Sequence, residues 1–273
     1  MLIEKAAVLY CFMDRVKSFQ RVPAPIIYVI YIGEGAMIFY LIRHGDPIYD
    51  PDSLTPLGHE QATALSKRLS LYGLDEIYAS SSIRAQMTAE PTCKALGKEM
   101  KICDWANEGH AFRDTSIARE DGERRWCFHQ QKFVEKFNTP ELLALGNEWY
   151  KDPFFKGTNL ETAMDRINRE TDEFFRSLGY EHDRKTGSYK VLFENKKRVA
   201  LFAHQGFGLL FLSSVLDIPY PLTCTRFDLG LSSVTVIDFG EEGNVYPKML
   251  QMSNDSHLYK EGILTGYNRG IDI

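Results

Sequence analysis

The sequence has few cysteines, and none of them forms a CxxC pair. There are five, an odd number, scattered as Cys11, Cys93, Cys103, Cys127 and Cys224. A framework of structural disulfides and a cysteine-based zinc site are therefore both poor interpretations. We expect reduced thiols and a cytoplasmic protein.

An excess of positive charge and a long apolar run are also missing. The 273 residues carry a formal net charge of −5, so we expect no nucleic-acid partner. The apolar stretch 24–33 (APIIYVIYIG) is too short to cross a bilayer, and Glu4 with no cleavage site after it makes a poor signal peptide. We predict no membrane partner. We interpret residues 1–36 either as an N-terminal extension of the domain or as the result of a start site assigned too far upstream.

What is present is an alternation of strand and helix patterns. MIFYLIR (37–43) has no polar alternation, which is typical of a strand covered on both faces. Further strand patterns are DEIYAS (75–80), EMKICDW (99–105), VALFAH (199–204), SSVTVIDF (232–239) and VYPKMLQM (245–252). Thr55 and Pro56 predict a helix start. A second helix is predicted over 82–97, in which Pro91 should cause a kink or a break.

This alternation predicts an α/β fold, a three-layer α/β/α sandwich with a mostly parallel central sheet. We take residues 37–273 as a single domain. Residues 109–190 are aromatic-rich, charged and largely helical in pattern, so we predict a cap inserted over the edge of the sheet. Its basic cluster is an ordinary solvated face or meets the far end of an anionic substrate: Arg113, Arg119, Arg124 and Arg125.

Cationic and polar side chains follow three of the predicted strands. Arg43 and His44 end the first strand, Arg84 begins the helix after the second, and His204 and Gln205 follow a later one. Ligands of parallel α/β sheets bind at the carboxyl ends of strands, where helix N-termini favour anions. Since arginine matches phosphate oxygens with two hydrogen bonds, the sequence predicts a phosphate pocket.

The same segments resemble a family. LIRHG, then LTPLGHEQA, SSSIRAQMTAE and a late ALFAHQG are similar, in order, to the histidine phosphatase superfamily, whose fold is phosphoglycerate-mutase-like. The resemblance covers roughly residues 37–110 and 158–255. It implies that His44 is a nucleophile that forms a phosphohistidine, and that Arg43, Arg84 and His204 hold the phosphoryl oxygens. It also implies that Gly45 lets the backbone approach the substrate closely.

The resemblance implies no metal ion and no cofactor, because two arginines supply the charge. Gln205 stands where the family often has glycine; its N–H would still donate to phosphate while its side chain narrows the pocket. The family places an acidic proton donor a few tens of residues after the second arginine. Glu108 fits that place best, with Asp104 and Asp114 as rivals.

Three functions remain open at this stage. The main prediction is a metal-independent phosphomonoesterase of the histidine acid phosphatase type, acting on a small phosphorylated metabolite. A phosphoglycerate-mutase-type phosphotransferase is less favoured, because DPIYDPDS replaces the serine and Trp-Asn pair of the mutase pattern. A pseudoenzyme that binds a phosphorylated ligand is the third. Asp46 and Asp50 predict negative charge near the mouth, which disfavours very acidic substrates.

Overall fold

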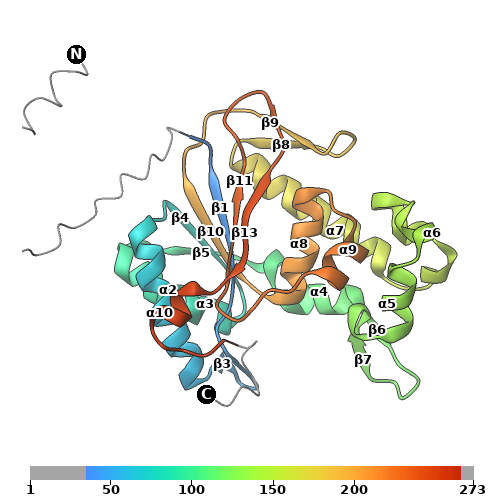
Figure 1. The fold of residues 1–273 in the computed structure, drawn as a ribbon, viewed down its shortest axis with the longest axis horizontal. Helices are drawn as coiled ribbons and strands as arrows, with labels where there is room; N and C mark the ends of the chain where they lie inside the picture. Colours follow the sequence, from blue (N-terminus) through green and yellow to red (C-terminus); the bar gives the residue numbers. More distant parts are fainter. Residues whose placement is uncertain (1–34, 266–273) are drawn as a thin grey trace, which may run out of the picture. The chain divides into compact units, whose positions relative to one another are not determined.

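A computed structural model describes residues 35–265, so the predicted extension 1–36 lies almost entirely outside the described residues. Its centre is a six-stranded sheet in the order β13-β11-β1-β10-β4-β5 (Figure 1). The strands are β1 (Ile38–Arg43), β4 (Glu76–Ser80), β5 (Met100–Cys103), β10 (Arg198–Ala203), β11 (Val234–Asp238) and β13 (Lys248–Asn254). Strands β1, β10, β4 and β5 are parallel, and β11 runs antiparallel to both β1 and β13. The prediction of a mostly parallel sheet is confirmed.

Alternate residues of the central strand pack on opposite faces of the sheet. Phe39 and Leu41 belong to one hydrophobic cluster, whereas Tyr40 and Ile42 belong to a second. All four are buried. The strand therefore reads as a continuous apolar run, because helices cover both of its faces.

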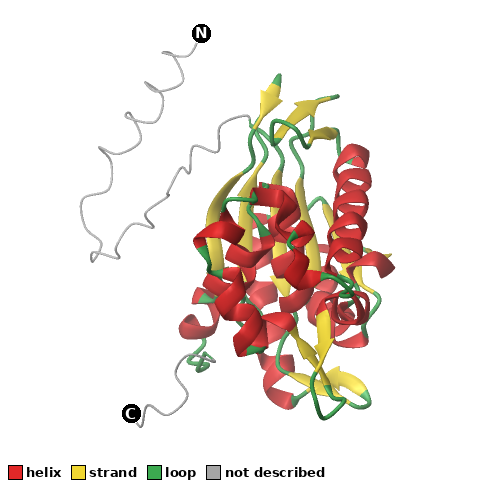
Figure 2. Ribbon diagram, turned by 90° about the vertical axis from the view of Figure 1, so that its right-hand side faces the viewer, coloured by secondary structure: helices red, strands yellow, loops and turns green. Residues whose placement is uncertain are grey.

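Helices form the two outer layers (Figures 1 and 2). In Figure 1, the left-hand layer holds α2 (Pro56–Tyr72), α3 (Ile83–Leu96) and α10 (Ser256–Lys260). The right-hand layer holds α4 (Glu108–Thr115), α7 (Leu160–Ser177), α8 (Gln205–Leu216) and α9 (Tyr220–Arg226). Helix α2 begins as predicted, with the Thr55 hydroxyl accepting from the Gly58 N–H. Helix α3 runs through Pro91 without ending, so the predicted break does not occur.

Residues 109–190 contribute to two different parts of the structure. Helix α7 is a layer of the sandwich itself, because the rings of Phe174 and Phe175 contact Phe39 of β1. The remainder includes β6 (Ser116–Ala118), β7 (Arg124–Trp126), α5 (Gln131–Phe137) and α6 (Pro140–Leu143), at the right of Figure 1. Many of its aromatic residues pack on one another, as Phe137 does on Trp149 and Phe155.

Further short antiparallel strands lie outside the central sheet. They are the hairpin β2 (Pro47–Tyr49) and β3 (Asp52–Leu54), the hairpin β8 (Tyr180–Asp183) and β9 (Ser188–Val191), and β12 (Asn244–Val245), which pairs with β9. None of the helices within residues 35–265 combines the length and apolar content that a membrane span needs.

Candidate active site

Strand register places the two predicted histidines at one edge of the sheet. Arg43 of β1 pairs with Ala203 of β10, so the next residue of each strand, His44 and His204, emerges at the same level. The His44 N–H donates to the Ala203 carbonyl at 3.0 Å. The two imidazole centroids lie 5.2 Å apart.

The loop after β1 is held by backbone contacts that only glycine permits. A Cβ on Gly45 would lie 2.7 Å from the Gly58 carbonyl oxygen, so this glycine makes room for α2. This corrects the expectation that Gly45 makes room for the substrate. The Gly45 N–H donates to Thr88 Oγ1 at 3.0 Å, and that hydroxyl donates to the Arg84 carbonyl at 2.7 Å. Thr88 thereby joins the loop to the helix that carries Arg84.

His44 is held in a form suited to nucleophilic attack. Its Nδ1 lies 2.7 Å from the Gly45 carbonyl oxygen, which only an N–H can satisfy, so the lone pair is on Nε2. Burial and the nearby guanidinium groups of Arg43 and Arg84 lower the pKa of His44 to about 3. The imidazole is therefore neutral throughout the mildly acidic and neutral range.

Both predicted arginines line the cavity at this edge. Arg84 Nη1 binds Asp52 at 2.8 Å, and its Nη2 donates to His204 Nδ1 at 3.1 Å. Its Nε is buried and has no hydrogen-bond partner among residues 35–265. Arg43 Nη1 donates to the Leu229 carbonyl. A buried, unsatisfied donor beside a second guanidinium is suited to an incoming anion.

His204 is fully buried, and its neighbours keep it neutral. Because Nδ1 accepts from Arg84, the ring proton lies on Nε2, which donates to Ser80 Oγ at 2.8 Å. Burial, His44 and the two arginines lower the pKa of His204 well below its ordinary value.

Of the three candidate acids, only Glu108 lines the cavity together with His44, and it also lies beside the buried His204. Its Oε2 lies 3.3 Å from His204 Nδ1, and its Oε1 accepts from the Phe207 N–H at the start of α8. Burial raises the pKa of Glu108 to about 7. Asp114 is paired with Arg166 of α7 at 2.6 Å, and Asp104 is an exposed partner of His110. Neither aspartate lines the cavity.

The same three side chains form a potential metal-ligand set. Ligand atoms of His44, Glu108 and His204 all lie within 4.8 Å of one another. However, Arg84 donates to the His204 nitrogen that a metal would need. Two guanidinium groups beside the set favour an anion over a divalent cation.

Comparison with known proteins identifies the family. The model of the histidine phosphatase superfamily (branch 1) matches residues 39–251. The chain belongs to this superfamily. No curated protein sequence gives a significant match.

Solved structures show the same fold at low sequence identity. A phosphoserine phosphatase mutant from Entamoeba histolytica in complex with phosphoserine is 18% identical, with a TM-score of 0.52 over 81% of this chain and 99% of that one. A mycobacterial glucosyl-3-phosphoglycerate phosphatase with inorganic phosphate is 16% identical, with a TM-score of 0.51 over 81% of this chain and 98% of that one. At such identities the likeness concerns the fold.

This histidine phosphatase has a cavity of about 590 Å³ at the site. Gln205 lines it, but its side-chain amide is turned to the carboxylate of Asp228. The aspartate at the cavity is also not one of the two that the sequence predicted there. Asp46 accepts from the Thr55 hydroxyl at 2.7 Å, and neither Asp46 nor Asp50 is among the described residues that line the cavity. Asp52 is the aspartate that lines it, and it is paired with Arg84.

Three residues of the site were missed by sequence reasoning. Asp52 binds Arg84 and also accepts from the Ile83 N–H at 2.7 Å, where the N-cap residue Ser82 makes no side-chain bond. Ser80 orients His204, and Trp126 of β7 forms part of the cavity wall. Each contact joins residues from different elements, so no local pattern signals it.

Proposed function

We propose that this histidine phosphatase is a metal-independent phosphomonoester hydrolase that forms a phosphohistidine on His44, with a small phosphorylated metabolite as substrate. The observation that carries the proposal is the state of His44. Its Nδ1 is bound to the Gly45 carbonyl, its pKa of about 3 keeps Nε2 unprotonated, and two arginines flank it. A neutral imidazole beside fixed positive charge is suited to attack on a phosphate ester.

The first half-reaction transfers the phosphoryl group to the enzyme. His44 Nε2 forms a bond to phosphorus while the bond from phosphorus to the leaving oxygen breaks. Glu108, whose pKa of about 7 keeps it protonated in mild acid, gives its proton to that oxygen. Arg43, Arg84 and the N–H of Gln205 bind the phosphoryl oxygens.

His204 needs a second proton to donate to the phosphoryl group, since Nε2–H is already bound to Ser80. A bound phosphate dianion would favour this protonation, because nearby negative charge raises the pKa of an imidazole. In the second half-reaction the Glu108 carboxylate takes a proton from water. The water oxygen bonds to phosphorus, the P–N bond breaks and inorganic phosphate leaves.

Hydrolysis of p-nitrophenyl phosphate in chelator-treated buffer tests the proposal. The wild type should be active without metal, and His44→Ala should lose at least about 10⁴-fold in kcat. Wild type quenched in alkali during turnover should carry protein-bound phosphate that is stable to alkali and labile to acid, which His44→Ala should lack. An inactive wild type across pH 4–8 would support the pseudoenzyme alternative, whereas activity restored only by added metal would refute the metal-free mechanism.

A further inference from the structure

The cavity has two chemically different parts. Arg43, His44, Arg84 and Glu108 form its phosphoryl end. The outer part is where the leaving group of a phosphate ester must lie. Since Glu108 is the proton donor in the proposed function, the leaving oxygen lies at its carboxyl, and the body of the leaving group extends from that point.

An indole ring lies next to this point. A Cβ on Gly206 would come within 2.3 Å of the Trp126 ring and within 2.6 Å of Glu108 Oε1, so both groups crowd the same glycine. Phe112 meets Trp126 edge to face at 5.1 Å, and Phe128 stacks on it at 5.3 Å. Trp126 is therefore held in place before any ligand binds, as an apolar wall beside the proton donor.

Several polar side chains of the outer part are already paired. The Asn107 side chain accepts from Gly109 N–H and donates to Ser81 Oγ, both at 2.8 Å. The Gln205 amide is bound to Asp228, and the two Asp52 oxygens are bound to Arg84 and the Ile83 N–H. Beyond the two arginines of the phosphoryl end, the described residues that line the cavity include no lysine or arginine.

The basic cluster of the insertion does not supply the missing cation. Arg119 and Arg125 pair with Glu123, Arg113 pairs with Asp114, and Arg124 binds Ser116. None of these four arginines lines the cavity. The insertion contributes Phe112 and Trp126 instead.

We propose that the site selects phosphomonoesters whose leaving group is uncharged and aromatic or otherwise apolar, and that it discriminates against leaving groups that carry a carboxylate. This inference rests on the proposed hydrolase function. A carboxylate in the outer part would lose water without gaining a cationic partner, which weakens binding of the transition state. An aryl group would pack on the fixed face of Trp126.

Two matched esters test the selectivity: the phenolic phosphate of para-hydroxyphenylacetate and that of its primary amide. The two have the same shape, and the methylene group keeps their leaving-group chemistry similar. We expect kcat/KM for the amide to exceed that for the acid by at least about tenfold. Equal rates, or a preference for the acid, would overturn the inference while leaving the hydrolase function intact. Failure to hydrolyse either ester or p-nitrophenyl phosphate would refute both.

Two variants locate the cause. Trp126→Ala should lower kcat/KM for the amide ester by about tenfold and leave the Ki of orthovanadate, which reports the phosphoryl end, unchanged; Trp126→Phe should retain most of the rate. Ile83→Lys places an ammonium group in the cavity at a half-exposed position and should raise the relative rate of the acid ester. Leu71→Lys, exposed and outside this cavity, is the charge-matched control and should not. An unchanged rate in Trp126→Ala, or an equal gain in both lysine variants, would contradict the assignment.

Discussion

Two histidines with buried side chains in the described part of the chain each lie close to a carboxyl group, but the pKa shifts of the two pairs run in opposite directions. Glu108 and His204 approach to 3.3 Å in the active site, and Asp172 and His182 approach to 3.1 Å between α7 and β8. Both histidine side chains have no exposed surface. In the first pair, the pKa of the Glu108 carboxyl is raised and that of the His204 imidazole is lowered, which favours the neutral form of both. In the second pair, the pKa of the His182 imidazole is raised and that of the Asp172 carboxyl is lowered, which favours an ion pair.

Burial and surrounding positive charge determine the pKa shifts of the first pair, Glu108 and His204. Burial and the positive neighbours Arg43 and Arg84 oppose a second positive charge on His204, and its pKa is lowered well below the ordinary value. Burial raises the pKa of Glu108 to about 7, and the same arginines only partly oppose that rise.

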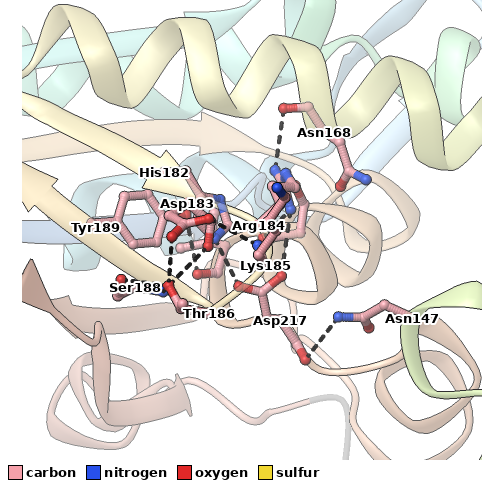
Figure 3. A network of polar contacts seen from close by, with 12 residues as sticks. Asn147, Asn168, His182, Asp183, Arg184, Lys185, Thr186, Ser188, Tyr189 and Asp217 are labelled. Atoms are coloured by element: carbon pink, nitrogen blue, oxygen red, sulfur yellow. Dashed lines mark hydrogen bonds and ion pairs between the residues drawn. The ribbon is translucent and has the colours of Figure 1, made fainter.

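In the other pair, a second carboxylate, Asp217, helps to raise the pKa of His182. Burial opposes the charge on His182, but Asp172 and Asp217, the latter at 2.7 Å from Nε2, raise its pKa. Figure 3 shows His182, Arg184 and Asp217 pointing toward one another. Arg184 binds Asp172 and the Ser214 carbonyl, which ties the β8–β9 hairpin to α7 and α8.

Distance and burial alone therefore do not determine which partner of such a pair is more readily protonated. The two sites also differ in whether their charged groups already have partners within the protein. In the His182 network, both ring nitrogens have carboxylate partners. In the active site, Arg84 Nε has no partner within the described part of the chain. We expect the first arrangement to contribute to stability, whereas the second leaves a donor free for the anion of the proposed reaction.

We expect the largest effect from replacing Glu108, the acid of the first pair. Glu108→Gln should lower kcat/KM for an alkyl phosphate by about 10²–10⁴-fold, because the leaving alkoxide then has no proton donor. The loss should be much smaller with p-nitrophenyl phosphate, whose phenolate leaves without a proton. Wild type should also lose activity toward alkyl phosphates as the pH rises through about 7, where Glu108 ionises.

Asp172→Asn is the matched control, since it removes the ionisable carboxyl of the other pair. Its activity per folded molecule should equal that of the wild type. Equal losses with alkyl and p-nitrophenyl substrates in Glu108→Gln would contradict the role of Glu108 as proton donor, and Asp104→Asn would then be the next variant to assay.

The second effect concerns stability. His182→Gln should lower the free energy of unfolding at pH 6 by about 1–3 kcal/mol, because two partly exposed carboxylates lose one of their cationic partners. Urea denaturation measures this change. Activity per folded molecule should stay the same, and the exposed change His59→Gln should leave stability within about 0.5 kcal/mol of wild type. A His182→Gln protein as stable as wild type would mean that the network contributes nothing net.

The smallest effect is the pH dependence of that stability difference. Because folding raises the pKa of His182, its contribution is fully present below the unfolded value of about 6.5 and is lost as the pH rises through the folded pKa. Asp172 has a lowered pKa, so its contribution is lost in strong acid. The difference between wild type and His182→Gln should shrink from pH 6 toward alkaline pH; growth in that direction would contradict a protonated His182.

Features carried by strands and their ends could be predicted from the sequence. The apolar run before Arg43 and His44, and the one before His204, indicated parallel strands, and strand ends of a parallel sheet meet at one edge. The sandwich and the meeting of these residues followed from that. Thr55 and Pro56 marked the start of α2 for an equally local reason.

Contacts between distant segments could not be predicted. Spacing alone left Glu108, Asp104 and Asp114 as rivals, and only the packing of α4 against α8 and α7 separates them. Asp52 contacts Arg84 from the β2–β3 hairpin, and Trp126 of β7 lies against Gly206. Gly45 was assigned to the substrate because nothing in the sequence shows that Gly58 lies against it.

The hydroxyl of Thr88, which bonds both the Gly45 N–H and the Arg84 carbonyl, has a consequence for turnover. It fixes the spacing of the nucleophile's loop and the helix bearing Arg84 in the unliganded protein. An anion site that is already assembled does not distinguish a phosphate ester from the inorganic phosphate that remains after hydrolysis. For the proposed reaction we therefore expect inorganic phosphate to inhibit turnover, so that the rate depends on the ratio of ester to free phosphate.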